Sequence, residues 1–210
     1  PGDMSPVPPV VSDVGNVLVR WEPKRLFSRL FPDPVARDRF LAEICTEAWN
    51  REMDRGRPFA EGIADLVARH PDREREIRAW DECWHEMVPG AVEGSVAILE
   101  RLRDRGVPLY AITNFSREKF AEARERFPFL KIFRDTVVSA HEGLLKPDPA
   151  IYRVLLERNH LVAGECLFID DTVDNVEGAR AVGMAAVRFV SPEQLERDLS
   201  AHGVELDRSV

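Results

Sequence analysis

Short apolar runs separated by longer segments with a helical repeat dominate the hydropathy pattern of the chain. The runs lie at residues 10–12, 107–113, 136–139, 166–169 and 185–190. Apolar runs of this length between turn residues predict buried strands. From residue 92 onward, segments with a helical repeat alternate with these runs. They predict helices at about 92–105, 116–127, 149–156, 176–182 and from Ser191 onward. Strands that alternate with helices predict an α/β fold with a parallel sheet.

The stretch 21–88 contains no strand-like run and has its own helical pattern. Its Pro, Asp and Gly residues predict helices over about 34–55, 58–70 and from Asp72 onward. On the third helix, Ile77, Trp80, Trp84 and Met87 form an apolar stripe on one face. We therefore expect residues 1–20 and 89–210 to form one α/β core and residues 21–88 to form an inserted helical cap subdomain.

Composition narrows the class of protein. The chain has 210 residues, of which 44% are hydrophobic and 31% charged, and its net charge is −8. An acidic balance argues against nucleic acid as a partner, because phosphate neutralisation requires clustered Lys and Arg. No run approaches the length of a membrane span. The three cysteines are scattered and the first ten residues lack the layout of a signal peptide, so we expect a cytoplasmic protein without a zinc site.

Four polar features directly follow predicted strands. They are Asp13, Thr113 with Asn114, Lys146 in GLLKPDP, and Asp170 with Asp171. Because the carboxyl ends of parallel strands meet at one edge of a sheet, we expect all four to converge there.

The chemistry of this set is coherent. Carboxylates from two strands can share one Mg²⁺, and the backbone carbonyl of Gly15 can add a further oxygen ligand. The Thr113 hydroxyl or the Asn114 amide can donate a hydrogen bond to an oxyanion, and Lys146 can neutralise a nucleophile and a transferred phosphoryl group. We therefore expect Asp13 to be a nucleophile, a metal ligand, or both.

The motifs resemble those of the haloacid dehalogenase superfamily of hydrolases. The matching segments are DVGNVLV at 13–19, ITN at 112–114, KPDPAIY at 146–152 and FIDDTVDN at 168–175. The resemblance covers nearly the whole chain and implies a Rossmann-like parallel sheet, with 21–88 at the place of the helical cap of the first subclass. The D-x-G-N-V form also resembles a subgroup of bacterial sugar-phosphate phosphatases.

The resemblance implies a role for each residue of the motifs. Asp13 would attack phosphorus and form an aspartyl-phosphate. Asp13, the Gly15 carbonyl and Asp171 would hold Mg²⁺, with Asp170 acting directly or through water. Thr113 and Asn114 would hold phosphoryl oxygens, and Lys146 would offset their charge. The partner would be a small phosphorylated molecule. Apart from the resemblance, the sequence leaves open whether the protein is a monomer or a homodimer.

The chain departs from the family at Gly15, where most phosphatases of the family carry an Asp that serves as general acid and base. General acid–base assistance is typically worth about 10²–10⁴-fold in rate. The glycine is compatible with a substrate whose leaving group needs little help, with a substitute from the cap or from water, or with a different reaction.

Two other functions stay open. The first is a dehalogenase of the same superfamily, which uses the Asp nucleophile without a metal and whose departing halide needs no proton. The second is a binding module that retains the fold without activity. The adjacent carboxylates Asp170 and Asp171 favour the phosphatase, because they would repel Asp13 unless a cation were present. Asn16, Arg20 and Trp21 lie just beyond the nucleophile turn and are candidate substrate-binding residues.

Overall fold

A single parallel sheet forms the centre of the molecule. The computed structural model describes residues 7–206, so residues 1–6 of the N-terminal decapeptide lie outside it. The strands are β1 (Val10–Ser12), β2 (Leu109–Thr113), β3 (Asp135–Val138), β4 (Leu167–Asp170) and β5 (Ala185–Arg188), in the order β3-β2-β1-β4-β5. The predicted α/β class is confirmed. β2 starts two residues later than expected, since Pro108 has no N–H to give to the ladder.

The strand order reverses direction at β1, which is the topological switch point of the sheet. From this central strand the chain goes to β2 and β3 on one side and later to β4 and β5 on the other. Ser12 is in register with Ala111 of β2 and Ile169 of β4, so these three strands end side by side. In open α/β sheets, ligands bind in the crevice at this switch point.

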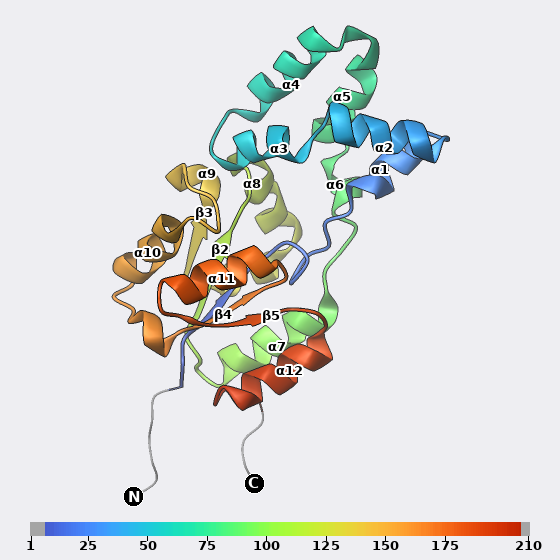
Figure 1. The fold of residues 1–210 in the computed structure, drawn as a ribbon. Coiled ribbons are helices and arrows are strands. Elements are labelled where there is room, and N and C mark those ends of the chain that lie inside the picture. Colours follow the sequence, from blue (N-terminus) through green and yellow to red (C-terminus); the bar gives the residue numbers. More distant parts are fainter. Residues whose placement is uncertain (1–6, 207–210) are drawn as a thin grey trace, which may run out of the picture.

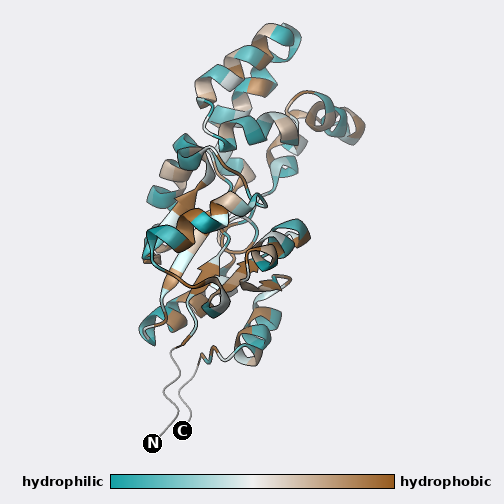
Figure 2. Ribbon diagram, turned by 60° about the vertical axis from the view of Figure 1, so that its left-hand side comes forward, coloured by the Kyte–Doolittle hydropathy of each residue, from teal (hydrophilic) through white to brown (hydrophobic). Residues whose placement is uncertain are grey.

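Helices cover both faces of the sheet (Figure 1). α10 (Pro149–Arg158) and α11 (Val173–Ala181) pack on one face, and α7 (Glu93–Asp104), α8 (Arg117–Arg126) and α12 (Pro192–Ala201) pack on the other. The one-turn helix α9 (Ser139–Glu142) follows β3 directly. Every strand residue of β1, β2 and β4 is buried, since helices cover both faces of the sheet. The strands are accordingly rich in hydrophobic residues, as Figure 2 shows.

The segment between β1 and α7 is helical and lies beyond the carboxyl ends of the strands (Figure 1). Its helices are α1 (Pro23–Leu30), α2 (Pro34–Glu43), α3 (Glu47–Asp54), α4 (Phe59–Arg69), α5 (Glu74–Glu82) and α6 (Trp84–Met87), with a 3₁₀ turn at Pro71–Arg73. Here we call residues 21–88 the helical segment. Within residues 7–206, no helix is both long and apolar enough to cross a membrane.

Two helix predictions in this segment are wrong. The single helix expected over 34–55 is split after Glu43, because the Thr46 hydroxyl accepts a hydrogen bond from the Trp49 N–H and starts a new helix. The stripe from Ile77 to Met87 falls on two helices that are separated at Cys83. All four side chains of that stripe are nevertheless buried.

Candidate active site

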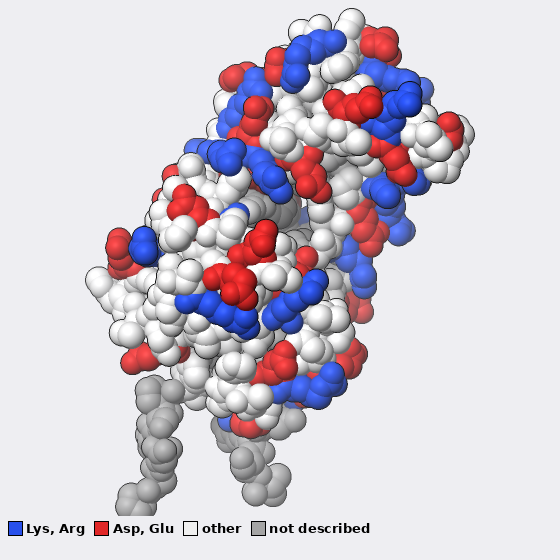
Figure 3. Space-filling view, in the orientation of Figure 1, with Lys and Arg blue, Asp and Glu red and all other residues white. Residues whose placement is uncertain are grey.

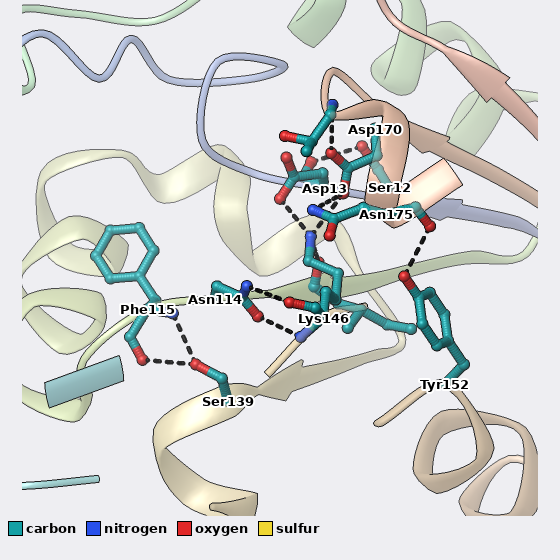
Figure 4. A network of polar contacts seen from close by, with 11 residues as sticks. Ser12, Asp13, Asn114, Phe115, Ser139, Lys146, Tyr152, Asp170 and Asn175 are labelled. Atoms are coloured by element: carbon teal, nitrogen blue, oxygen red, sulfur yellow. Dashed lines mark hydrogen bonds and ion pairs between the residues drawn. The ribbon is translucent and has the colours of Figure 1, made fainter. Parts of the chain in front are cut away.

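Three carboxylates meet where β1 and β4 end, and Figure 4 labels two of them, Asp13 and Asp170. The N–H of Asp13, directly after β1, donates to the Ile169 carbonyl at 2.8 Å, which brings Asp13 beside the last residue of β4, Asp170. Asp171 follows in the next turn. One oxygen from each carboxylate lies within 4.8 Å of the others. The predicted convergence of these residues is therefore present in the structure.

Lys146 reaches this cluster from the loop before α10. Its Nζ donates to Asp13 Oδ1 at 2.7 Å, to Asp170 Oδ2 at 2.8 Å and to the Ile112 carbonyl at 2.8 Å. These bonds use all three ammonium hydrogens. The side chain is 1% exposed. Lys146 pairs with Asp13 and Asp170, and Asp171 lies beside them, so ionisation of all three carboxylates leaves the cluster with two unbalanced negative charges.

The electrostatics of the cluster reflect that imbalance. Burial raises the pKa of Asp13 well above its usual value; Lys146 opposes this effect and the charge of Asp170 adds to it. Burial also raises the pKa of Asp171. Burial alone would lower the pKa of Lys146, but Asp13 and Asp170 outweigh it and hold that pKa above its ordinary value. The lysine is thus charged, and the carboxylates require more positive charge than it supplies.

Two elements hold the Lys146 loop in place. The Lys146 N–H donates to Asn114 Oδ1 at 2.9 Å, and Asn114 Nδ2 donates to the Lys146 carbonyl at 3.1 Å. From the other side, α11 approaches so closely that a Cβ on Gly178 would lie 2.9 Å from the Pro147 carbonyl oxygen. The Asn114 amide therefore positions the lysine through its backbone.

Asp170 is fully buried and has a fixed orientation. The Thr172 N–H donates to its Oδ1 at 2.9 Å, and Asn175 Nδ2 donates to its Oδ2 at 3.1 Å. The Tyr152 hydroxyl donates to the Asn175 carbonyl at 2.7 Å and ties α10 to α11. Polar partners thus compensate the burial of this carboxylate.

A cavity of about 220 Å³ opens above the cluster, between the strand ends and the helical segment. Figure 3 shows the surface hollowed between these two parts. Of the predicted site residues, those that line the cavity are Asp13, Gly15, Asn16, Arg20, Trp21, Asn114, Lys146 and Asp171. Thr113 and Asp170 are buried and do not line it.

The turn after Asp13 forms one side of the cavity. Asn16 adopts a left-handed backbone with φ of 59°, and its Oδ1 accepts a hydrogen bond from the Trp21 N–H at 2.9 Å. The Trp21 ring packs on Trp84 of α6, with ring centroids 4.7 Å apart. Arg20 is exposed on the rim. The side-chain oxygen of Asn16 thus closes the turn.

Gly15 leaves open space beside Asp13. A Cβ at this position would meet no atom within 4 Å, and its φ lies outside the left-handed region. The backbone therefore does not require glycine here, and a side chain is absent where the cavity could accommodate one.

The opposite wall carries two polar residues that the sequence analysis missed. Asn50 and Asp54 both lie on α3 and line the cavity. Their spacing of four residues, which places two side chains on one helix face, is the signal that could have identified them. In a segment rich in Asp and Glu, that signal is weak without knowledge of which face meets the core.

The donor set fits a hard divalent cation. Mg²⁺ prefers carboxylate and carbonyl oxygens, and the cluster of Asp13, Asp170 and Asp171 offers such oxygens together with an excess of negative charge. The sulfur and imidazole ligands that soft metals prefer are absent from this cluster. The residues present are therefore suited to Mg²⁺.

Comparisons with known proteins agree with the geometry. The family profile of haloacid dehalogenase-like hydrolases matches residues 10–183. Sesquiterpene phosphatase astK of Aspergillus oryzae is 35% identical over 129 residues, which cover 52% of this chain and 66% of the relative. Phosphatase MT3486 of Mycobacterium tuberculosis is 37% identical over 114 residues, or 52% of each protein. Both matches span less than two thirds of the relative's own length.

A solved structure shares the fold. The HAD family enzyme bt-2542 of Bacteroides thetaiotaomicron, in complex with magnesium and inorganic phosphate, superposes with a TM-score of 0.66 at 19% identity. The match covers 89% of this chain and 96% of that one. Since the family profile extends from β1 through α11, the chain belongs to the haloacid dehalogenase-like hydrolases.

Proposed function

We propose that this hydrolase is a Mg²⁺-dependent phosphatase that acts on a small phosphorylated metabolite, such as a sugar phosphate, through an aspartyl-phosphate on Asp13. The observation that carries the proposal is the convergence of three carboxylates and one buried lysine at the strand ends. The phosphatase names of the two relatives support it. In this account residues 21–88 act as a cap that encloses the substrate.

The residues divide the work as follows. Asp13, Asp171 and the Gly15 carbonyl would hold Mg²⁺, and Asp170 would bind the ion either directly or through a water molecule. When bound, Mg²⁺ supplies positive charge that offsets the repulsion between carboxylates and phosphoryl oxygens. Lys146 fixes the Asp13 carboxylate for in-line attack on phosphorus and compensates the charge that develops in the transition state.

The cavity sets the scale of the substrate. A volume of about 220 Å³ suits a small metabolite. Trp21, Trp84 and Phe115 give one part of the wall an apolar surface, while Arg20 on the rim can pair with an anionic group. The substrate class that fits is a compact phosphate monoester.

A hydrolysis panel tests the proposal. The purified protein is assayed on phosphate monoesters and on 2-haloacids, with Mg²⁺ or with EDTA, beside Asp13→Asn and the exposed control Asp104→Asn. We expect Mg²⁺-dependent phosphate release that Asp13→Asn abolishes and Asp104→Asn retains. Halide release in EDTA would instead identify a dehalogenase, a reaction that the missing side chain at Gly15 would permit. No turnover of either class would favour a binding module.

A further inference from the structure

The glycine at position 15 leaves the proposed reaction without a proton donor beside the nucleophile. In an in-line displacement the leaving oxygen departs on the side of phosphorus away from Asp13. With Asp13 at the strand ends, that side faces the wall formed by the helical segment. Among the described residues that line the cavity, Asp54 is the only carboxylic acid on that wall.

Two contacts hold the end of α3 against the core. Ser139 Oγ accepts a hydrogen bond from the Phe115 N–H at 2.9 Å and donates to the Asp54 carbonyl at 2.5 Å (Figure 4 shows the Ser139–Phe115 part). Two residues later, Gly56 has φ of 113°, and a Cβ there would lie 2.8 Å from the Ala140 carbonyl oxygen. Asp54 is thus fixed relative to the loop that carries Asn114.

Asp54 is a largely buried residue that lines the cavity, and its carboxyl group lacks a polar partner on the described part of the protein. The residue is 9% exposed, and within residues 7–206 its side chain has no hydrogen bond or ion pair. Burial raises the pKa of Asp54 to about 7, and the charge of Arg51 one turn earlier opposes this effect. A carboxylic acid that keeps its proton near neutral pH can serve as a general acid.

Other charged groups lie on the elements that pack against α3 and on the other walls of the cavity. They are Glu61 and Asp65 on α4, which pair with Arg57; His141 and Glu142 on α9; and Arg20, Asp13, Lys146 and Asp171 on the other walls. None of them forms an ion pair with Asp54 in the described part of the chain.

Asn50 adds a second, independent sign that this wall contacts substrate. It lies one turn before Asp54 and lines the same cavity, and its buried Oδ1 has no hydrogen-bond partner among the residues that the structure describes. Buried polar atoms normally have partners, so an acceptor left open at a cavity is explained by a ligand that supplies the donor.

We propose that Asp54 is the general acid of the reaction and replaces the side chain missing at position 15; this rests on the phosphatase function proposed above. As an Asp13 oxygen bonds to phosphorus and the phosphorus–oxygen bond of the ester breaks, the Asp54 proton moves to the departing oxygen and the alcohol leaves. Water then attacks the aspartyl-phosphate and gives its proton to the Asp54 carboxylate. Phosphate departs, and both aspartates return to their starting states.

A pair of aryl esters isolates the proton-transfer step. Phenyl phosphate and 4-nitrophenyl phosphate have similar size, but the nitrophenolate leaves readily without a proton. The rate of phenol or nitrophenol release is measured in a single turnover with Mg²⁺, for the wild type, Asp54→Asn, Asp54→Glu, Asp13→Asn and Glu47→Gln, an exposed residue of the same helix.

The proposal predicts a difference between the two esters. Asp54→Asn should slow phenol release by about 10²-fold and nitrophenol release by less than about threefold, because only the poorer leaving group needs the proton. Asp54→Glu should recover part of the loss, and Glu47→Gln should resemble the wild type. Phenol release by the wild type should fall above about pH 7, and Asp54→Asn should lose that fall.

The contradicting results are distinct for the two proposals. Equal effects of Asp54→Asn on both esters, or no effect with the high-pH fall retained, would overturn the role of Asp54 while the phosphatase function stands. A wild type that releases phosphate from neither ester, or an Asp13→Asn protein that is fully active, would overturn the phosphatase function and the role of Asp54 with it. If Asp54→Asn does not fold, Asp54→Glu is compared with the wild type in the same way: slower release of phenol but not of nitrophenol supports the role of Asp54, and equal effects on both esters overturn it.

Discussion

The two walls of the cavity treat their polar groups in opposite ways. At the strand ends, Asp13, Lys146 and Asp170 form a closed network of short contacts. On the helical wall, the buried Asn50 Oδ1 and the carboxyl group of the largely buried Asp54 have no polar partner within residues 7–206. Unpaired buried polar groups destabilise a folded protein and gather at functional sites. In the proposed reaction the strand ends bind the phosphoryl group, and the helical wall contacts the leaving group.

Of the changes considered, removal of Lys146 at the strand ends should lower the stability of the protein most. Lys146→Met leaves buried carboxylates without their cation, so we expect a loss of about 3–5 kcal/mol in the free energy of unfolding. Phosphate release should also be lost. Urea unfolding measures the first effect, with Lys131→Met, at a half-exposed position, as the control. A Lys146→Met protein as stable as that control would contradict the network described here.

The unpaired wall should respond in the opposite direction, with a gain in stability. Since the pKa of Asp54 is raised from 3.8 to about 7 in the folded protein, ionisation penalises the folded state, and stability falls as pH rises from about 4 to about 7. A tenfold change in proton affinity is worth about 1.4 kcal/mol, so the penalty above pH 7 reaches at most about 4 kcal/mol. Asp54→Asn removes it.

We therefore expect Asp54→Asn to be more stable than the wild type at pH 8 and equally stable at pH 4, as measured by urea unfolding at each pH. Glu47→Gln on the same helix should show no such difference. A variant that is less stable at both pH values would mean that the Asp54 carboxyl has a structural partner.

Metal binding should stabilise the strand-end wall by an intermediate amount. A ligand at about 100 times its dissociation constant stabilises the folded state by about 2.7 kcal/mol. Mg²⁺ should therefore raise the thermal midpoint of the wild type, and EDTA should reverse the rise. Asp171→Asn should abolish the response, whereas Asp54→Asn should retain it. Equal shifts in Asp171→Asn and the wild type would place the ion elsewhere.

A smaller effect is expected where α11 supports the Lys146 loop. In Gly178→Ala the new methyl group meets the Pro147 carbonyl at 2.9 Å, a backbone atom that cannot rotate away. Overpacking of this kind costs about 1–3 kcal/mol, and the displaced loop should also lower kcat. Gly164→Ala, where a Cβ meets nothing within 4 Å, is the control. If Gly178→Ala is destabilised but its kcat is unchanged, the packing of α11 on the loop does not position Lys146 for catalysis.

The sequence predicted the strand-end wall better than the helical wall, for a physical reason. Strand ends in a parallel sheet meet at one edge, so Asp13, Asp170 and Lys146 could be placed together from their positions after apolar runs. The helix breaks at Thr46 and Cys83 were missed because a local cap and a change of direction interrupt an otherwise continuous helical pattern.

The direction that a helix faces depends on packing between distant segments, which periodicity does not specify. Asp54 lines the cavity, and Ser139 on α9, far away in the sequence, donates a hydrogen bond to its carbonyl. The same limit applies to Asn114, whose amide pairs with the backbone of Lys146, a contact that the sequence does not indicate. Long-range contacts of this kind require the structure.

The most direct test of the central claim is to trap the covalent intermediate. The protein is mixed with Mg²⁺ and 4-nitrophenyl phosphate, quenched in acid during turnover, and digested for mass spectrometry. The account predicts one phosphoryl group on the peptide that contains Asp13, and none in Asp13→Asn. Turnover of the ester with no phosphoryl group on that peptide, or with the group on another residue, would contradict it.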